Sequence, residues 1–233
     1  MYWSADLARR LKIPKITVIE FGVAGGNGLL ALEELAEVMG QHHGVEIRVA
    51  GFDMGSGLPP AKDYRDIAHV WGQGFFEMDE AALRKRLKPS TTLLLGDVGD
   101  TVQQFLKEEF PPIGFISFDM DYYSSTKKAF AIFRSGPETK LPRVYCHFDD
   151  MVAPEIACHN EYVGEMLAIR EFNEEHDLRK ICKLAYLPWS RQHPAIWHEQ
   201  AFVFHDFEHP LYTANITPSG DFHQQLRLAG TDR

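Results

Sequence analysis

Short apolar runs alternate along the chain with stretches in which apolar residues recur every three or four positions. Residues 16–19 are a β-branched run that ends at Glu20 and a cluster of glycines, which is typical of a buried strand entering a tight loop. Apolar residues then recur at helical spacing over residues 29–39, and Gly40 is a stop signal. The chain is therefore predicted to open with a strand, a glycine-rich loop and a helix.

The same alternation continues through most of the sequence. Further strands are predicted at 47–52, 92–95, 113–118 and 144–148, and helices at 80–87, 101–109, 125–133 and 155–176. Two last strands, 179–187 and 201–207, have no helix of their own and predict a terminal hairpin. Repeated strand-then-helix units favour a mostly parallel sheet covered on both faces. We expect a Rossmann-like, doubly wound α/β fold with seven strands, one of them antiparallel.

Neither repeats nor a shift in composition divides the chain, so residues 1–233 are predicted to form one domain. The tail 208–233 has little periodicity and is interpreted as a flap, an oligomer arm or a disordered end. Hydrophobic residues make up 45% of the chain and charged residues 24%, as in ordinary globular domains.

Charge and cysteine content narrow the class of partner. Lys and Arg number 24 against 33 Asp and Glu, a net charge of −9 that argues against nucleic acid as a partner. Three scattered cysteines provide neither a disulfide framework nor a zinc ribbon. Because we find no long apolar stretch and no signal-peptide pattern, we expect no membrane partner and a cytoplasmic location.

Carboxylates follow the predicted strands at the places where ligands bind in open α/β sheets. Each residue taken singly could be a helix cap or a loop carboxylate. A carboxylate at each of five consecutive strand ends favours a ligand-binding site. The residues concerned are Glu20, Asp53, Asp97, Asp119 with Asp121, and Asp149 with Asp150.

The glycine loop at 20–28 suits a ligand that approaches the backbone closely, and Gly22 and Gly26 are the expected contacts. A dinucleotide loop would read Gly-x-Gly-x-x-Gly after the strand, and this pattern fails at Ala24 and Asn27. A frame that starts at Gly26 lies too deep in the predicted helix.

Two carboxylates are placed to bind a nucleoside. Asp53 could accept hydrogen bonds from two ribose hydroxyls, and Asp97 could contact an adenine edge. Both positions also suit ordinary turns.

The segments 118–126 and 147–150 carry the densest acidic residues. If they end adjacent strands, three or four carboxylates share a small volume and need a cation or raised pKa values. Oxygen-only ligands favour Mg²⁺ over Zn²⁺. The alternative is that some of these aspartates cap the helices predicted from 125 and 155.

Four motifs together resemble the macrocin O-methyltransferase type of class I S-adenosylmethionine-dependent methyltransferases. The motifs are Glu-x-Gly-Val-x-Gly-Gly at 20–26, Gly-Phe-Asp-x-x-x-Gly-Leu-Pro at 51–59, Asp-x-Asp-x-Tyr-x-Ser-Thr at 119–126, and the Asp-Asp pair at 149–150. The resemblance spans residues 16 to about 150. Departures from the family pattern are Met120 in place of Gly, Tyr122 in place of Leu, and residues 138–143 in place of glycines.

The resemblance implies two bound groups, S-adenosylmethionine and Mg²⁺. It implies that Asp119, Asp149 and Asp150 hold the metal and that Asp121 is the general base. The cofactor contacts predicted from the strand ends and the resemblance are Glu20, Gly22, Gly26, Asp53, Asp97 and Asp119.

The family usually carries helices before the glycine strand that cover the acceptor, and here about fifteen residues precede that strand. The cover must come from the loop after Asp53, from the tail, from a partner subunit in a homo-oligomer, or from the loop 188–199. That last loop could form a ring-binding wall or be an ordinary surface loop. Its candidate residues are Trp189, Arg191, His193, Trp197 and His198.

The predicted function is a Mg²⁺-dependent O-methyltransferase acting on a hydroxyl of a small polar molecule, such as a sugar unit or a natural-product intermediate. The alternatives are an NAD(P)-dependent oxidoreductase on a related sheet and a cofactor-binding protein without turnover.

Overall fold

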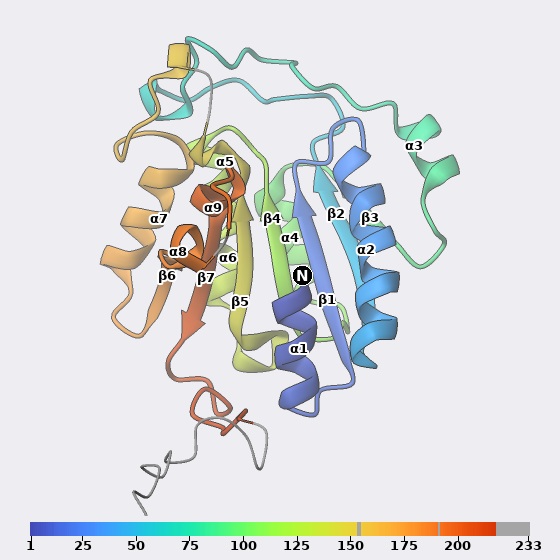
Figure 1. The fold of residues 1–233 in the computed structure, drawn as a ribbon. Helices are drawn as coiled ribbons and strands as arrows, with labels where there is room; N and C mark the ends of the chain where they lie inside the picture. The colour runs from blue at the N-terminus through green and yellow to red at the C-terminus, as the bar shows by residue number, and fades with distance from the viewer. Residues whose placement is uncertain (153–154, 191, 218–233) are drawn as a thin grey trace, which may run out of the picture.

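The structure is a computed structural model that describes residues 1–152, 155–190 and 192–217. Seven strands form one sheet in the order β3-β2-β1-β4-β5-β7-β6 (Figure 1). All neighbouring strands are parallel except that β7 runs antiparallel to β5 and to β6. The strands are β1 Lys15–Phe21, β2 Glu46–Asp53, β3 Thr92–Leu95, β4 Ile113–Phe118, β5 Lys140–Phe148, β6 Arg179–Lys183 and β7 Ala201–Asp206.

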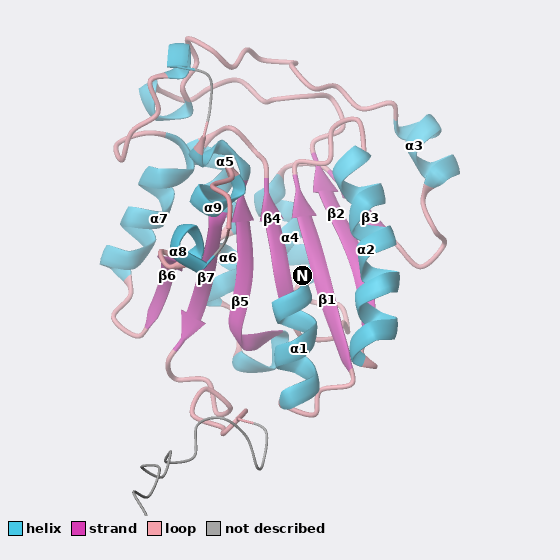
Figure 2. Cartoon of the chain, in the orientation of Figure 1, coloured by secondary structure: helices cyan, strands magenta, loops and turns pink. Residues whose placement is uncertain are grey.

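Helices cover both faces of this sheet (Figure 2). The largest buried cluster joins one face to α4, α5, α6 and α7, and two smaller clusters join the other face to α1, α2 and α3. The helices are α1 Tyr2–Arg10, α2 Asn27–His43, α3 Glu80–Arg86, α4 Val98–Phe105, α5 Tyr123–Ala129, α6 Ala131–Arg134, α7 Gly164–Glu175, α8 Leu187–Ser190 and α9 Trp197–Gln200. The predicted Rossmann-like fold, with seven strands and one antiparallel, is confirmed.

Several predicted boundaries are wrong. The helix predicted over 155–176 begins only at Gly164, after a turn in which the Asn160 side chain accepts from the Tyr162 N–H. The helix predicted over 125–133 is two helices, and the strand predicted over 179–187 ends at Lys183. Helix α1 and the short helices α8 and α9 were not expected at all.

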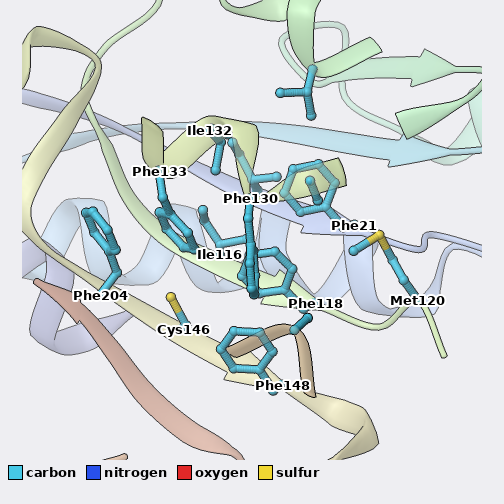
Figure 3. Close-up of a cluster of buried hydrophobic side chains, with 14 of the residues drawn as sticks. Phe21, Ile116, Phe118, Met120, Phe130, Ile132, Phe133, Cys146, Phe148 and Phe204 are labelled. Carbon is cyan, nitrogen blue, oxygen red and sulfur yellow. The ribbon is translucent and has the colours of Figure 1, made fainter. Parts of the chain in front are cut away.

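Stacked phenylalanines in the core fix the ends of β4 and β5 relative to each other. Phe118 and Phe148 are register partners, and their rings stack with centroids 4.5 Å apart (Figure 3). Both rings are fully buried. Because each phenylalanine is the last residue of its strand, the aspartates that follow must emerge side by side.

Candidate active site

A cavity of about 290 Å³ lies beyond the carboxyl ends of the strands, at the switch point between β1 and β4. Its floor comes from the loops after β1 to β5, and its roof from residues 54–79, which we call the lid. The lid crosses the carboxyl ends of the parallel strands (Figure 1). The lining residues are Gly22, Ala24, Phe52, Asp53, Met54, Gly57, Leu58, Pro59, Trp71, Phe75, Phe76, Gly96, Asp97, Val98, Asp119, Met120, Asp121, Ser125, Asp149 and Asp150.

Gly22 is where the glycine loop meets the end of β4. Its φ is +85°, and a Cβ built on it would lie 1.6 Å from the carbonyl oxygen of Asp119. Only glycine can occupy this position without moving the backbone. The predicted close approach at Gly22 is therefore a backbone-to-backbone contact at the edge of the cavity.

Asp53 holds the glycine loop in place. Its Oδ2 accepts the N–H groups of Val23 and Ala24, each at 2.9 Å, and its Oδ1 accepts the N–H of Gly55 at 2.6 Å. A carboxylate oxygen can accept two hydrogen bonds, so Oδ1 keeps capacity for one donor in the cavity. One ribose hydroxyl fits this arrangement better than the two that the sequence suggested.

Glu20 and Gly26 do not line the cavity. Glu20 is 5% exposed, and a Cβ on Gly28 would lie 1.9 Å from its Oε1. Burial, with repulsion from Asp119 and Asp53, raises the pKa of Glu20 to about 8.

Gly26 is the N-cap of α2, with φ +84°, and a Cβ there would meet the Leu83 side chain at 2.3 Å. A side chain at Gly26 would therefore enter the space of Leu83, and a ligand contact at the Gly26 backbone stays a prediction. This glycine makes room for α3.

Asp97 caps α4, as its alternative interpretation suggested. Its Oδ1 accepts the Gly99 N–H at 2.8 Å, and Lys128 forms an ion pair with its Oδ2. It nevertheless lines the cavity, so a nucleoside contact at this residue stays a prediction.

The aspartates after β4 and β5 form a compact cluster. Asp119, Asp149 and Asp150 each offer a carboxylate oxygen within 4.8 Å of the others. Gln200 at the end of α9 donates to the carbonyl and Oδ1 of Asp149, at 2.8 and 3.1 Å. Asp150 Oδ2 accepts the N–H of Asp121 at 2.8 Å, and Asp121 has φ +57°. These hydrogen bonds restrain the carboxylates of Asp149 and Asp150.

Electrostatics in the cluster favour bound protons or a bound cation. Desolvation and repulsion mainly from Asp150 raise the pKa of Asp119 to about 7, although this residue is exposed at the cavity. Burial and the same repulsion raise the pKa of Asp121 to about 8. Burial and repulsion from Asp149 raise the pKa of Asp150 to about 6. Such crowding is stable only if charge is neutralised.

Glu165 in the first turn of α7 is a further acidic residue that the sequence did not indicate. It is 1% exposed, and neither carboxylate oxygen has a hydrogen-bond partner among the described residues. Burial, with repulsion from Asp150 and Asp119, raises its pKa well above the usual range. No spacing in the sequence connects this residue to the aspartates, because a turn and a helix start separate them.

The lid supplies the cover, as one of the sequence alternatives proposed. Trp71, Phe75 and Phe76 line the roof, and none of them was singled out beforehand. No described residue of 188–199 lines the cavity; Arg191 lies outside the described residues.

The tail contributes nothing to the cover over its described part. Residues 208–217 lie at the opposite end of the sheet (Figure 1). There His209 Nε2 bonds to the carbonyl of Pro137, and Tyr212 accepts from Arg143. Residues 218–233 lie outside the described residues.

No protein-family model and no curated sequence matches this chain. Among solved structures, the chain is similar to CalS11, a calicheamicin methyltransferase, with 24% identity and a TM-score of 0.59 over 88% of this chain and 77% of that one. The fold is a Rossmann-like methyltransferase fold. The O-methyltransferase NovP is similar too, with 15% identity and a TM-score of 0.58 over 88% of this chain and 76% of that one.

Proposed function

We propose that this protein is an S-adenosylmethionine-dependent O-methyltransferase of the macrocin type that uses Mg²⁺ and acts on a hydroxyl of a small polar molecule. The observation that carries the proposal is the aspartate cluster, opening into the same cavity as the glycine loop. The likeness to a calicheamicin methyltransferase and to an O-methyltransferase supports the activity. A sugar unit or a natural-product intermediate is the acceptor class we propose.

The residues present fit a hard divalent cation. Asp119, Asp149 and Asp150 offer oxygen ligands only, which suits Mg²⁺. A cation bound by the aspartates would also oppose the repulsion from Asp150 and Asp119 that, together with burial, raises the pKa of the unpartnered Glu165 carboxyl. A Mg²⁺ ion held there would supply Lewis acidity that favours the deprotonated acceptor hydroxyl.

The cavity also fits a sulfonium nucleoside better than a dinucleotide. The carboxylate of Asp53 lies beside the glycine loop and would repel a pyrophosphate. Asp53 Oδ1 and the wall at residues 96–98 can receive a ribose and a base. S-adenosylmethionine would supply the electrophilic methyl group.

Asp121 is the proposed general base. It borders the cavity next to the cluster, and its raised pKa makes it a stronger base than an exposed aspartate once it is ionised. Asp121 would take the proton of the acceptor hydroxyl, and the acceptor oxygen would displace the methyl group from the sulfur of S-adenosylmethionine, which would leave S-adenosylhomocysteine. The lid and the glycine loop would hold the two reactants in one cavity, which would lower the entropic part of the barrier.

The remaining expectations stay proposals. We propose one domain acting in the cytoplasm, with a small-molecule acceptor, no nucleic acid or membrane partner, and a homo-oligomeric assembly. The three cysteines are free, which suits a reducing compartment. No helix among the described residues has the length and apolar character needed to span a bilayer.

A thermal-shift panel tests the function. S-adenosylhomocysteine should raise the unfolding temperature and NAD should not, because only a ligand of the native state stabilises it. Stabilisation by NAD alone would favour the oxidoreductase. Binding of S-adenosylhomocysteine without methyl transfer to any of a panel of hydroxylated acceptors would favour the protein without turnover.

A further inference from the structure

The lid is closed on itself by hydrogen bonds between its two limbs. Leu58 donates its N–H to the Phe75 carbonyl at 2.8 Å, and Gly74 donates to the Leu58 carbonyl at 2.8 Å. Nearer the base of the lid, Met78 donates to the Gly55 carbonyl at 3.1 Å. A Cβ on Gly57 would lie 2.5 Å from the Phe75 carbonyl oxygen, so the limbs are in direct contact. The lid is therefore a compact loop whose position depends on how its far end is held.

Asp66 fastens the far end to the start of α5. It is fully buried, and its Oδ1 accepts the N–H of Ser124 at 2.8 Å. Its Oδ2 accepts the Ser124 hydroxyl at 3.0 Å and the Lys62 N–H at 2.8 Å. Hydrogen bonds to a buried carboxylate are stronger than neutral ones.

Tyr122 makes a second attachment to the same segment. Its side chain is fully buried, and its hydroxyl donates to the carbonyl of Trp71 at 3.0 Å. This hydroxyl reaches the lid from the residue directly after Asp121. The position of the lid and the position of the proposed base are thus tied through one short segment.

The backbone around the attachment is held in an uncommon conformation. Ile67 has φ +53°, which is costly for a β-branched residue, and it is fully buried. A Cβ on Gly164 would lie 3.2 Å from Ile67 Cδ1, so the lid also contacts the start of α7. Strain of this kind persists only where surrounding contacts enforce it.

The attachments place an aromatic wall opposite the aspartates. Phe75 and Phe76 line the cavity yet are 50% and 49% exposed. The indole N–H of Trp71 is shielded and has no hydrogen-bond partner among the described residues. Such a wall offers flat apolar surface to a molecule in the cavity.

We propose that Asp66 and Tyr122 are positioning residues that hold the lid closed before the acceptor binds, so that Trp71, Phe75 and Phe76 form a ready-made wall for the ring face of the acceptor. The acceptor part of this statement rests on the proposed function. The attachment of the lid does not.

Tyr122→Phe tests the proposal with little disturbance, because it removes one hydroxyl and keeps the ring. Tyr64→Phe is the matched control, since Tyr64 lies in the lid and is 73% exposed. Hydrogen exchange of residues 59–76 should become about fivefold faster in Tyr122→Phe, as expected for one lost buried hydrogen bond, and stay unchanged in the control. Asp66→Asn should accelerate the same segment further.

A spectroscopic measurement separates positioning from a general loss of stability. In protein labelled with 5-fluorotryptophan, the resonance absent from Trp71→Phe belongs to Trp71. It should shift or broaden in Tyr122→Phe, while the resonances of Trp3, Trp189 and Trp197 stay in place. S-adenosylhomocysteine affinity should change less than twofold in Tyr122→Phe, because the nucleoside half of the cavity does not depend on this hydroxyl.

The proposal would be overturned if, in Tyr122→Phe, hydrogen exchange of residues 59–76 is as slow as in the parent protein and the Trp71 resonance is unchanged. A uniform change of all four resonances would also overturn it, by showing a merely structural role. If the parent protein fails to bind S-adenosylhomocysteine, the proposed function is wrong, and the exchange results still decide whether Asp66 and Tyr122 hold the lid.

Discussion

Asp121 and Asp150 are joined by a hydrogen bond, yet they are predicted to do different work. Asp150→Asn and Asp149→Asn should weaken Mg²⁺ binding by about tenfold or more, because each removes charge from the three-carboxylate cluster. Asp121→Asn should keep metal binding and abolish methyl transfer, because an amide cannot accept the proton. Calorimetric Mg²⁺ titration of the three variants measures the difference.

The outcomes are distinguishable. Excess Mg²⁺ should restore part of the activity of Asp149→Asn and none of the activity of Asp121→Asn. If all three variants bind Mg²⁺ like the parent, the aspartates do not form a metal site. Activity that persists in EDTA would contradict a requirement for the metal.

Asp53 is expected to act on cofactor affinity through the glycine loop. Asp53→Ala leaves the N–H groups of Val23, Ala24 and Gly55 without their acceptor. We expect S-adenosylhomocysteine affinity to fall by about 2 kcal/mol, roughly thirtyfold, in calorimetry. Asp79→Ala is a control, since it removes a helix-capping aspartate at α3 that does not line the cavity. A fall in affinity as large in Asp79→Ala would mean that the effect is not local to the glycine loop.

At the scale of single residues, the sequence predicted the aspartates of the cluster but not the other residues around the cavity. Asp119 and Asp149 could be brought together from sequence alone, because each follows a strand of a parallel sheet and the carboxyl ends of neighbouring strands share an edge. Glu165 and Trp71 could not, since each reaches the site through an irregular connection whose path depends on tertiary contacts. The contact between Gly26 and Leu83 was not predicted, because the two residues lie 57 positions apart in the chain.

At the scale of elements, the turn from β1 into α2 depends on one glycine above the others. Gly22→Ala should lower the free energy of unfolding by about 3 kcal/mol or prevent folding, because it adds a clash with the Asp119 carbonyl to an unfavourable φ. Gly25→Ala is the matched control, since nothing lies within 4 Å of a Cβ built there. Urea denaturation of both variants measures the contrast, and equal stabilities would refute the backbone contact.

Elements with a strong period were predicted and weakly patterned ones were not. Strands β3 and β4 were predicted with the bounds that they have, because buried runs flanked by turn residues leave little choice. Helix α1 is short, and its apolar face becomes evident only where it packs on the sheet. The lid has neither a helical nor a strand period, so its course over the cavity follows from Asp66 and Tyr122, which no local pattern identifies.

At the scale of the whole molecule, acidic residues with raised pKa values gather at the carboxyl ends of the strands. Burial is the main cause of the raised pKa values of Glu20, Asp121, Asp150 and Glu165, and the pKa of the exposed Asp119 is raised as well. The sequence predicted this crowding from five strand ends in one sheet. It could not predict the degree of burial, which depends on the lid and on α7.

The crowding predicts how stability depends on pH. A carboxyl whose pKa is raised on folding stabilises the native state below its unfolded pKa, near 4, and this contribution is lost as pH rises through the folded value. For Asp150, Asp119 and Asp121 the folded values are about 6, 7 and 8. Without metal, the unfolding temperature should therefore fall between pH 5 and pH 8.5. Millimolar Mg²⁺ should raise the unfolding temperature strongly at pH 8.5 and only slightly at pH 5, because protons compete with the cation for the same oxygens.

Glu165→Gln tests how much of this pH dependence comes from one fully buried carboxyl. The amide has nearly the shape of the protonated carboxyl and cannot ionise, so the fall in unfolding temperature with pH should be shallower than in the parent protein. Glu161→Gln is the control, because that side chain belongs to an exposed residue four positions earlier. Calorimetric scans in EDTA at four pH values would measure the slopes. The same slope in Glu165→Gln, Glu161→Gln and the parent would show that Glu165 does not contribute to the pH dependence of stability. An unfolding temperature that rises from pH 5 to pH 8.5 would contradict the acidic cluster as a source of instability.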